Sequence, residues 1–126
     1  MSTSEIATVL AWHDAVNSND IDTLVELSSD DIVLPTDDDD PDQGLDELRE
    51  WATSSGVTLE IGRMFVHHGI VVVEETSTWA SDPDTPVREA IAFRVVEDQV
   101  VTVVRHGNLE EAFEATGLGE GDLYEQ

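Results

Sequence analysis

The chain has 126 residues, and its 29 acidic residues against five arginines and no lysine give a net charge of −24. Hydrophobic residues make up 40% of it, which favours a folded domain with a core over a disordered acidic tail. The absence of cysteine excludes disulfides and thiolate chemistry, no stretch is apolar enough to cross a bilayer, and no basic stripe is present to bind nucleic acid.

The first part of the chain is predicted to be mainly helical. Apolar residues recur at helical spacing in its first segment, and serine, asparagine and aspartate mark the breaks that follow. The predicted elements are, in order, a helix at residues 4–17, a short helix at 21–27, a short strand at 30–35, an acidic loop at 36–44 and a helix at 45–51.

After Gly56 the sequence becomes rich in β-branched residues, which is typical of strands. Short connectors between these segments favour antiparallel hairpins. The predicted elements are strands at residues 57–66, 69–80, 87–96 and 99–106, a helix at 109–118 and a flexible acidic tail at 119–126. Helices followed by antiparallel strands predict one α+β domain over residues 1–118, with the helices packed on one face of a curved sheet.

Trp12 and His13 stand near the end of the first helix. His13 shares the apolar stripe of that helix with Val9 and Val16. A histidine there can be a core residue that braces the helix, and we favour this over a catalytic role.

Glu74 and Glu75 interrupt an otherwise apolar strand. Side chains alternate along a strand, so one of the two must point to the inner face if the strand is central. A carboxylate in an apolar pocket could act as a general acid or base. The alternative, which we favour, is a wet strand edge where a glutamate pairs with Arg88 or Arg94.

The other three histidines lie at strand ends. His67 and His68 precede Gly69, and solvated histidines at a hairpin explain them best. His106 is the best candidate for a titrating group in the pocket, because histidine titrates near neutral pH. The alternative is a rim histidine bonded to Asn108 or water. No spacing typical of a metal site supports ligands drawn from these histidines, so no metal and no cofactor is expected.

The order of these segments resembles the nuclear transport factor 2-like superfamily. The stretches that carry the resemblance are "WHDAVNSNDIDTLVELSSDDIVL", "GLDELREW", the four strands and "RHGNLEEAFEATGL". This is the cone-shaped, cystatin-like α+β fold of SnoaL-like polyketide cyclases, ketosteroid isomerases and limonene epoxide hydrolase. The resemblance implies a deep apolar pocket and a homodimer formed through the sheet.

The catalytic positions implied by the resemblance are altered in this chain. Trp12 occupies the place of the tyrosine that donates to the oxyanion in the isomerases. Thr36 falls at the place of their catalytic base, with Asp37 beside it. Asn108 replaces the acid/base aspartate of the cyclases, and an amide does not titrate.

The sequence therefore predicts a protein that binds a small apolar molecule in the cone, with acid/base chemistry as an added possibility. A non-catalytic ligand-binding or protein-interaction scaffold is the alternative. The predicted catalytic residues are His106, Glu75 and Asp37. The side chains predicted to bind the ligand are Trp12, Trp51, His67, Trp79, Phe93, Val104 and Asn108.

The net charge indicates the salt concentration in which the protein is stable. The carboxylates are scattered along the whole chain, and their repulsion destabilises a compact fold at ordinary ionic strength. At molar salt the Debye length is only about 3 Å, so most of that repulsion is screened. We expect a cytoplasmic protein of a high-salt organism, with a specific basic partner as the competing explanation.

Overall fold

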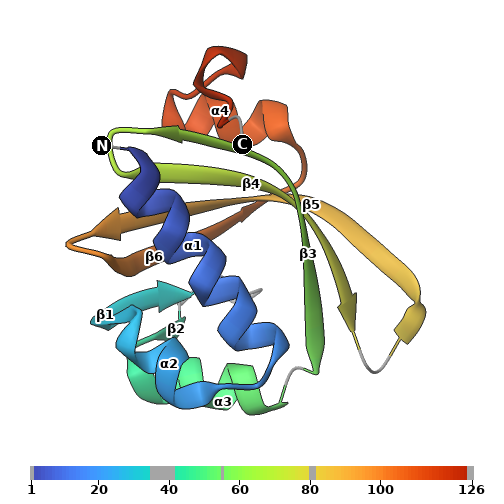
Figure 1. Cartoon of the computed structure of the whole chain (residues 1–126). Coiled ribbons are helices and arrows are strands. Elements are labelled where there is room, and N and C mark those ends of the chain that lie inside the picture. The colour runs from blue at the N-terminus through green and yellow to red at the C-terminus, as the bar shows by residue number, and fades with distance from the viewer. Residues whose placement is uncertain (1, 35–41, 55, 80–81, 125–126) are drawn as a thin grey trace.

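The computed structural model describes residues 2–34, 42–54, 56–79 and 82–124. Figure 1 shows the chain as a curved sheet with helices on both of its faces. The elements are α1 (Ser2–Asn17), α2 (Ile21–Glu26), β1 (Ser28–Leu34), β2 (Asp42–Gln43), α3 (Leu45–Ser54), β3 (Val57–His67), β4 (Ile70–Trp79), β5 (Asp82–Val96), β6 (Gln99–His106), α4 (Leu109–Thr116) and the 3₁₀ turn η1 (Glu120–Asp122).

The strands form one open sheet in the order β2-β1-β6-β5-β4-β3. Neighbouring strands are antiparallel except β1 and β6, which run parallel and make the sheet mixed. The predicted α+β fold, with N-terminal helices on a curved sheet, is confirmed. The parallel pairing of β1 was not predicted, because it joins strands far apart in the sequence.

Two apolar clusters lie on the two faces of the sheet. The inner cluster joins α1, α2 and α3 to the concave face, and Val9, Leu24 and Val73 are among its fully buried members. The outer cluster joins α4 to the opposite face, where Phe65 and Val72 pack. Figure 1 shows α1 crossing one face and α4 lying on the other. The inner cluster therefore holds the interior of the cone.

One predicted boundary differs from the structure. The segment before Val87 was predicted as a loop, yet β5 begins at Asp82 and pairs there with Trp79 of β4. In the tail, the Tyr124 N–H donates to the Met64 carbonyl at 2.8 Å, and the Tyr124 side chain packs against the inner cluster. The flexibility predicted for this tail stays a prediction.

None of the helices in the described segments combines the length and the apolarity needed to cross a bilayer.

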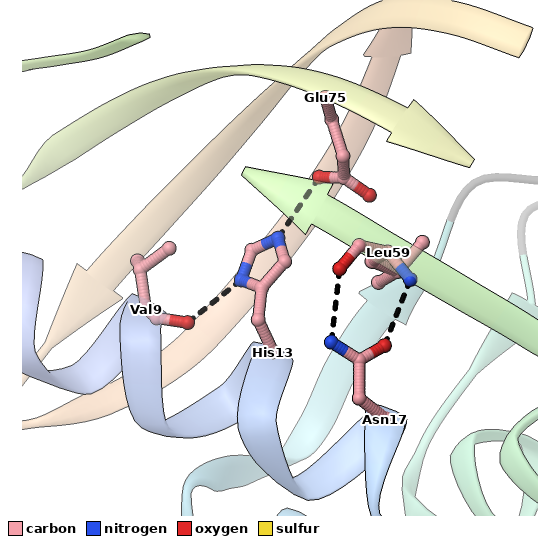
Figure 2. Close-up of polar contacts among 5 residues, drawn as sticks. All are labelled: Val9, His13, Asn17, Leu59 and Glu75. Carbon is pink, nitrogen blue, oxygen red and sulfur yellow. Dashed lines mark hydrogen bonds and ion pairs between the residues drawn. The ribbon is translucent and has the colours of Figure 1, made fainter. Parts of the chain in front are cut away.

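Asn17 joins the end of α1 to β3, an edge strand of the sheet (Figure 2). Its amide nitrogen donates to the Leu59 carbonyl at 2.9 Å, and its amide oxygen accepts from the Leu59 N–H at 2.8 Å. The side chain thus satisfies two backbone groups that β4 does not pair.

Replacing Asn17 with alanine should lower the free energy of unfolding by about 1–3 kcal/mol, because both Leu59 groups lose their partner. Urea unfolding in molar KCl measures this loss. Ser18→Ala is the matched control, since the Ser18 hydroxyl, just after α1, donates only to the exposed Asp14 carbonyl of that helix. Its effect should stay within about 0.5 kcal/mol. Equal losses in the two variants would show that the link to β3 contributes nothing.

Candidate functional site

A cavity of about 50 Å³ lies on the concave face of the sheet. Its wall is mostly apolar, with a few polar side chains from β4, β5 and β6. The lining residues are Trp12, Leu34, Trp51, Val57, Leu59, Glu75, Ser77, Trp79, Glu89, Ile91, Phe93, Val103 and Arg105. Of the predicted ligand-binding residues, the structure brings Trp12, Trp51, Trp79 and Phe93 together in this wall.

Trp12 forms a wall of the cavity and offers no hydrogen bond to it. Its ring stacks on Trp51 at 5.9 Å between centroids and meets Phe93 edge-on at 5.4 Å. The indole N–H donates to the Ser28 hydroxyl at 3.0 Å, and that hydroxyl donates to the Leu24 carbonyl. Because its one donor is used, Trp12 cannot stabilise an oxyanion in the cavity.

His13 and Glu75 form a buried pair beside the cavity (Figure 2). His13 is 1% exposed and Glu75 is 3% exposed. The His13 Nε2 lies 2.9 Å from the Glu75 Oε2, and the His13 Nδ1 lies 2.7 Å from the Val9 carbonyl oxygen. Glu75 also lines the cavity, so the pair connects α1 to the interior of the cone.

The geometry fixes how many protons this pair holds. A carbonyl oxygen only accepts, so the His13 Nδ1 must carry a proton and donate it to Val9. The short contact between Nε2 and the carboxyl oxygen requires a second proton between them, since two lone pairs would repel. The pair is therefore either imidazolium with carboxylate or imidazole with carboxylic acid. In both forms Glu75 has a proton within reach at the cavity.

The two adjacent glutamates have separate roles because they face opposite sides of β4. Glu75 points inward, while Glu74 points outward and pairs with Arg63 at 3.2 Å. The hydrogen bond from Arg63 holds the pKa of Glu74 below its ordinary value. The favoured expectation, a solvent-exposed glutamate at the edge of the strand, is therefore wrong for Glu75. Glu74 forms its ion pair with Arg63, whereas the prediction named Arg88 or Arg94 as the partner.

Glu89 and Arg105 complete the polar part of the wall, and the sequence interpretation missed both. Glu89 stands directly opposite Glu75 in the register of β4 and β5. The Arg105 Nε lies 3.4 Å from the Glu89 Oε2. The signal was present, since Glu89 alternates with Ile91 and Phe93 along one strand face.

His106 lies on the outer face of the sheet. It pairs with Ala90, which packs in the outer cluster, whereas its neighbour Arg105 lines the cavity. The predicted inward orientation of His106 is therefore wrong, and Val104, which is 40% exposed, was misplaced by the same shift of one residue. A shift of one residue along a strand reverses which side chains face inward.

Two other predicted residues, Asn108 and His67, are not in the cavity wall. Asn108 caps α4 and accepts from the Glu111 N–H at 2.9 Å, a role that the search for an acid/base residue overlooked. His67 lies at the far end of β3, 3.7 Å from Asp122. Asp37 lies outside the described residues.

No group of three or more histidine, aspartate or glutamate side chains in the described segments is placed to hold a metal ion.

Several solved structures share this fold at low sequence identity. An LEH-like epoxide hydrolase from Mycobacterium tuberculosis is 20% identical, with 90% of this chain and 89% of that chain covered and a TM-score of 0.71. RV0760c from the same organism, in complex with estradiol-17beta-hemisuccinate, is 15% identical, with 88% and 98% covered and a TM-score of 0.73. A cystatin fold protein from Novosphingobium aromaticivorans is 20% identical, with 84% and 98% covered and a TM-score of 0.71.

The sequence comparisons give the family. Curated proteins provide no significant match to this chain. The family model described as a SnoaL-like domain matches residues 9–104, which is well over half of the sequence. The resemblance to the nuclear transport factor 2-like superfamily is confirmed, and the chain belongs to the SnoaL-like domain family.

Proposed function

We propose that the cone binds a small apolar molecule and that the Glu75 carboxyl group exchanges a proton with it. The observation that carries this proposal is a buried carboxyl group that is bonded to a buried histidine and also lines an apolar cavity. General acid/base catalysis needs a titrating group within hydrogen-bond reach of the reacting atom. Among the described residues of the wall, Glu75 is the one carboxyl group that is joined to a histidine.

His13 acts on this chemistry through Glu75 and is a positioning residue. Its Nδ1 is held by the Val9 carbonyl, so the ring cannot turn away from the carboxyl group. Its Nε2 can keep or return the second proton of the pair. A ligand that gives a proton to Glu75 therefore meets a carboxylate whose orientation is fixed before binding.

The size of the cavity limits what can enter without a rearrangement. Ligand pockets commonly measure about 300–1,000 Å³, several times the space seen here. Trp51 and Trp79 are both partly exposed members of the wall. We propose that a ligand displaces these two rings and so occupies the space that they fill.

Two fold relatives support the choice of ligand and of chemistry. One is an LEH-like epoxide hydrolase, and the other was crystallised with a steroid derivative. Both share this fold at 20% and 15% identity, so they support a small-molecule ligand in the cone without identifying it.

The test is base-catalysed opening of 5-nitrobenzisoxazole, a small neutral probe. A base takes the proton on C3, its electrons form the nitrile as the N–O bond breaks, and the coloured cyanonitrophenolate leaves. We expect Glu75→Gln to reduce the protein-dependent rate by about 10²-fold. Glu60→Gln removes an equal charge from an exposed position on β3 and should leave the rate unchanged.

A second pair of variants tests whether the probe reacts inside the cavity. Ser77→Val narrows the cavity and should abolish both binding and turnover of the probe, whereas Glu75→Gln should reduce turnover alone. Thr76→Val, on the opposite face of the same strand, is the control and should change neither. If Glu75→Gln reacts as fast as the wild type, the acid/base role is wrong. Probe that binds in the cavity without turnover would favour the non-catalytic scaffold, which the tight packing of Trp12 on Trp51 also supports.

We also propose that the protein is a homodimer formed through the sheet, in the cytoplasm of a high-salt organism. Exposed valines on the outer face of the last two strands support the dimer, since Val96 and Val104 are 46% and 40% exposed. The net charge of −24 supports the high-salt setting. Analytical ultracentrifugation in molar KCl tests the dimer.

A further inference from the structure

We infer that the Ser77 hydroxyl anchors the ligand by donating a hydrogen bond to it, so that the cone selects apolar molecules with an acceptor oxygen, such as ketones and esters, over plain hydrocarbons. The inference rests on the proposed function, because it concerns the ligand of the same cavity. It follows from a buried hydroxyl that the protein itself leaves without a hydrogen bond.

Ser77 lies inside the cone on β4, which pairs with β3 on one side and with β5 on the other. It follows Glu75 by two positions, so the two side chains share the concave face. Ser77 is 6% exposed and lines the cavity. Its hydroxyl is one bond beyond Cβ and stays close to the wall in every rotamer. The position of this donor is therefore fixed before a ligand enters.

The Ser77 hydroxyl has no partner in the described part of the chain. No hydrogen bond joins it to another of these residues, whereas the Ser28 hydroxyl accepts from Trp12 and donates to the Leu24 carbonyl. Buried polar groups are bonded in the large majority of cases, and an unmet one costs free energy. A ligand oxygen that meets Ser77 removes this cost, and a hydrocarbon does not.

The wall holds other donors, and Ser77 differs from them in burial. Trp51 and Trp79 are partly exposed, and their indole N–H groups move with the rings that we propose the ligand displaces. Arg105 is exposed, and its Nε lies 3.4 Å from the Glu89 Oε2. Ser77 is therefore the donor of the wall that is both buried and unused.

The spacing of Ser77 and Glu75 indicates how one ligand reaches both. Residues two positions apart on a strand lie about 6.5–7 Å apart along it. A ligand whose oxygen accepts from Ser77 therefore holds an atom a few bonds away against the Glu75 carboxyl group. The His13–Glu75 pair has no net charge in either of its two forms, so this preference depends on the oxygen and not on the charge of the ligand.

Two probes that differ in one group test the inference. In 2-acetylnaphthalene an oxygen takes the place of the terminal methylene of 2-isopropenylnaphthalene, so the two molecules have nearly the same shape. Equilibrium dialysis against the full chain in molar KCl gives both affinities. In Ser77→Ala the ketone should bind about tenfold more weakly relative to the hydrocarbon, because its oxygen is left without a donor. The ratio of the two affinities cancels any change in cavity size that affects both probes.

Ser29→Ala is the matched control, since the Ser29 hydroxyl is also buried without a partner among the described residues but is not among those that line the cavity. It should leave the ratio unchanged. The inference is overturned if Ser77→Ala changes both affinities by the same factor, or if Trp51→Phe or Trp79→Phe removes the preference in its place. If neither probe nor 2-naphthalenemethanol binds the wild-type protein, the proposed function itself fails.

Discussion

Replacing His13 with alanine should lower the free energy of unfolding by about 3–5 kcal/mol, because it leaves Glu75 buried without its partner. Glu75 is 3% exposed, so its carboxyl group has little access to bulk water in place of the imidazole. The variant also loses ring contacts with Trp12 and Phe93, at 5.8 and 5.1 Å between centroids. Urea unfolding in molar KCl measures the change.

The double variant His13→Leu with Glu75→Leu separates lost packing from the unpaired carboxyl group. Two apolar side chains of similar size should recover most of the stability, since replacing both members of a buried pair is often neutral. The same protein should have no activity on 5-nitrobenzisoxazole. A loss below about 1 kcal/mol in His13→Ala would mean that the pair contributes little to folding.

Transfer from molar KCl to dilute buffer should unfold the protein, which circular dichroism during stepwise dialysis would show. Two carboxylates about 10 Å apart in water repel by about 0.4 kcal/mol. Summed over the pairs of a chain with net charge −24, this repulsion rivals the ~5–15 kcal/mol that stabilises an ordinary domain.

Sucrose at the same low ionic strength controls for a general effect of solutes, because it stabilises compact states without screening charge. Refolding in KCl but not in sucrose would support adaptation to salt. A protein that keeps its full stability in dilute buffer would contradict this explanation of its composition and would favour a specific basic partner.

The fold was predictable because hydrophobic periodicity records which residues are buried locally. Helical spacing located α1, and β-branched runs located β3, β4 and β6. The pairing of β1 with β6 was not predictable in this way, since it joins residues such as Ser28 and Val100 across most of the chain.

The site was predicted only in part, for two physical reasons. The contact between His13 and Glu75 spans 62 positions, and no local pattern indicates such a pair. The inward face of β6 was misassigned because Val103 and Val104 are equally apolar. The alternation of side chains therefore does not show which of the two faces inward. The register of β5 with β6 decides this, because it places Arg105 opposite Ile91 and so puts Val103 on the inward face.

The central claim is that a small apolar molecule enters the cone and reaches Glu75. The most direct test is nuclear Overhauser contacts between bound 2-naphthalenemethanol and protein methyl groups labelled with ¹³C. We predict contacts to Leu59, Ile91 and Val103 of the cavity wall. Contacts confined to Ile70 and Leu109 on the outer face would contradict the claim.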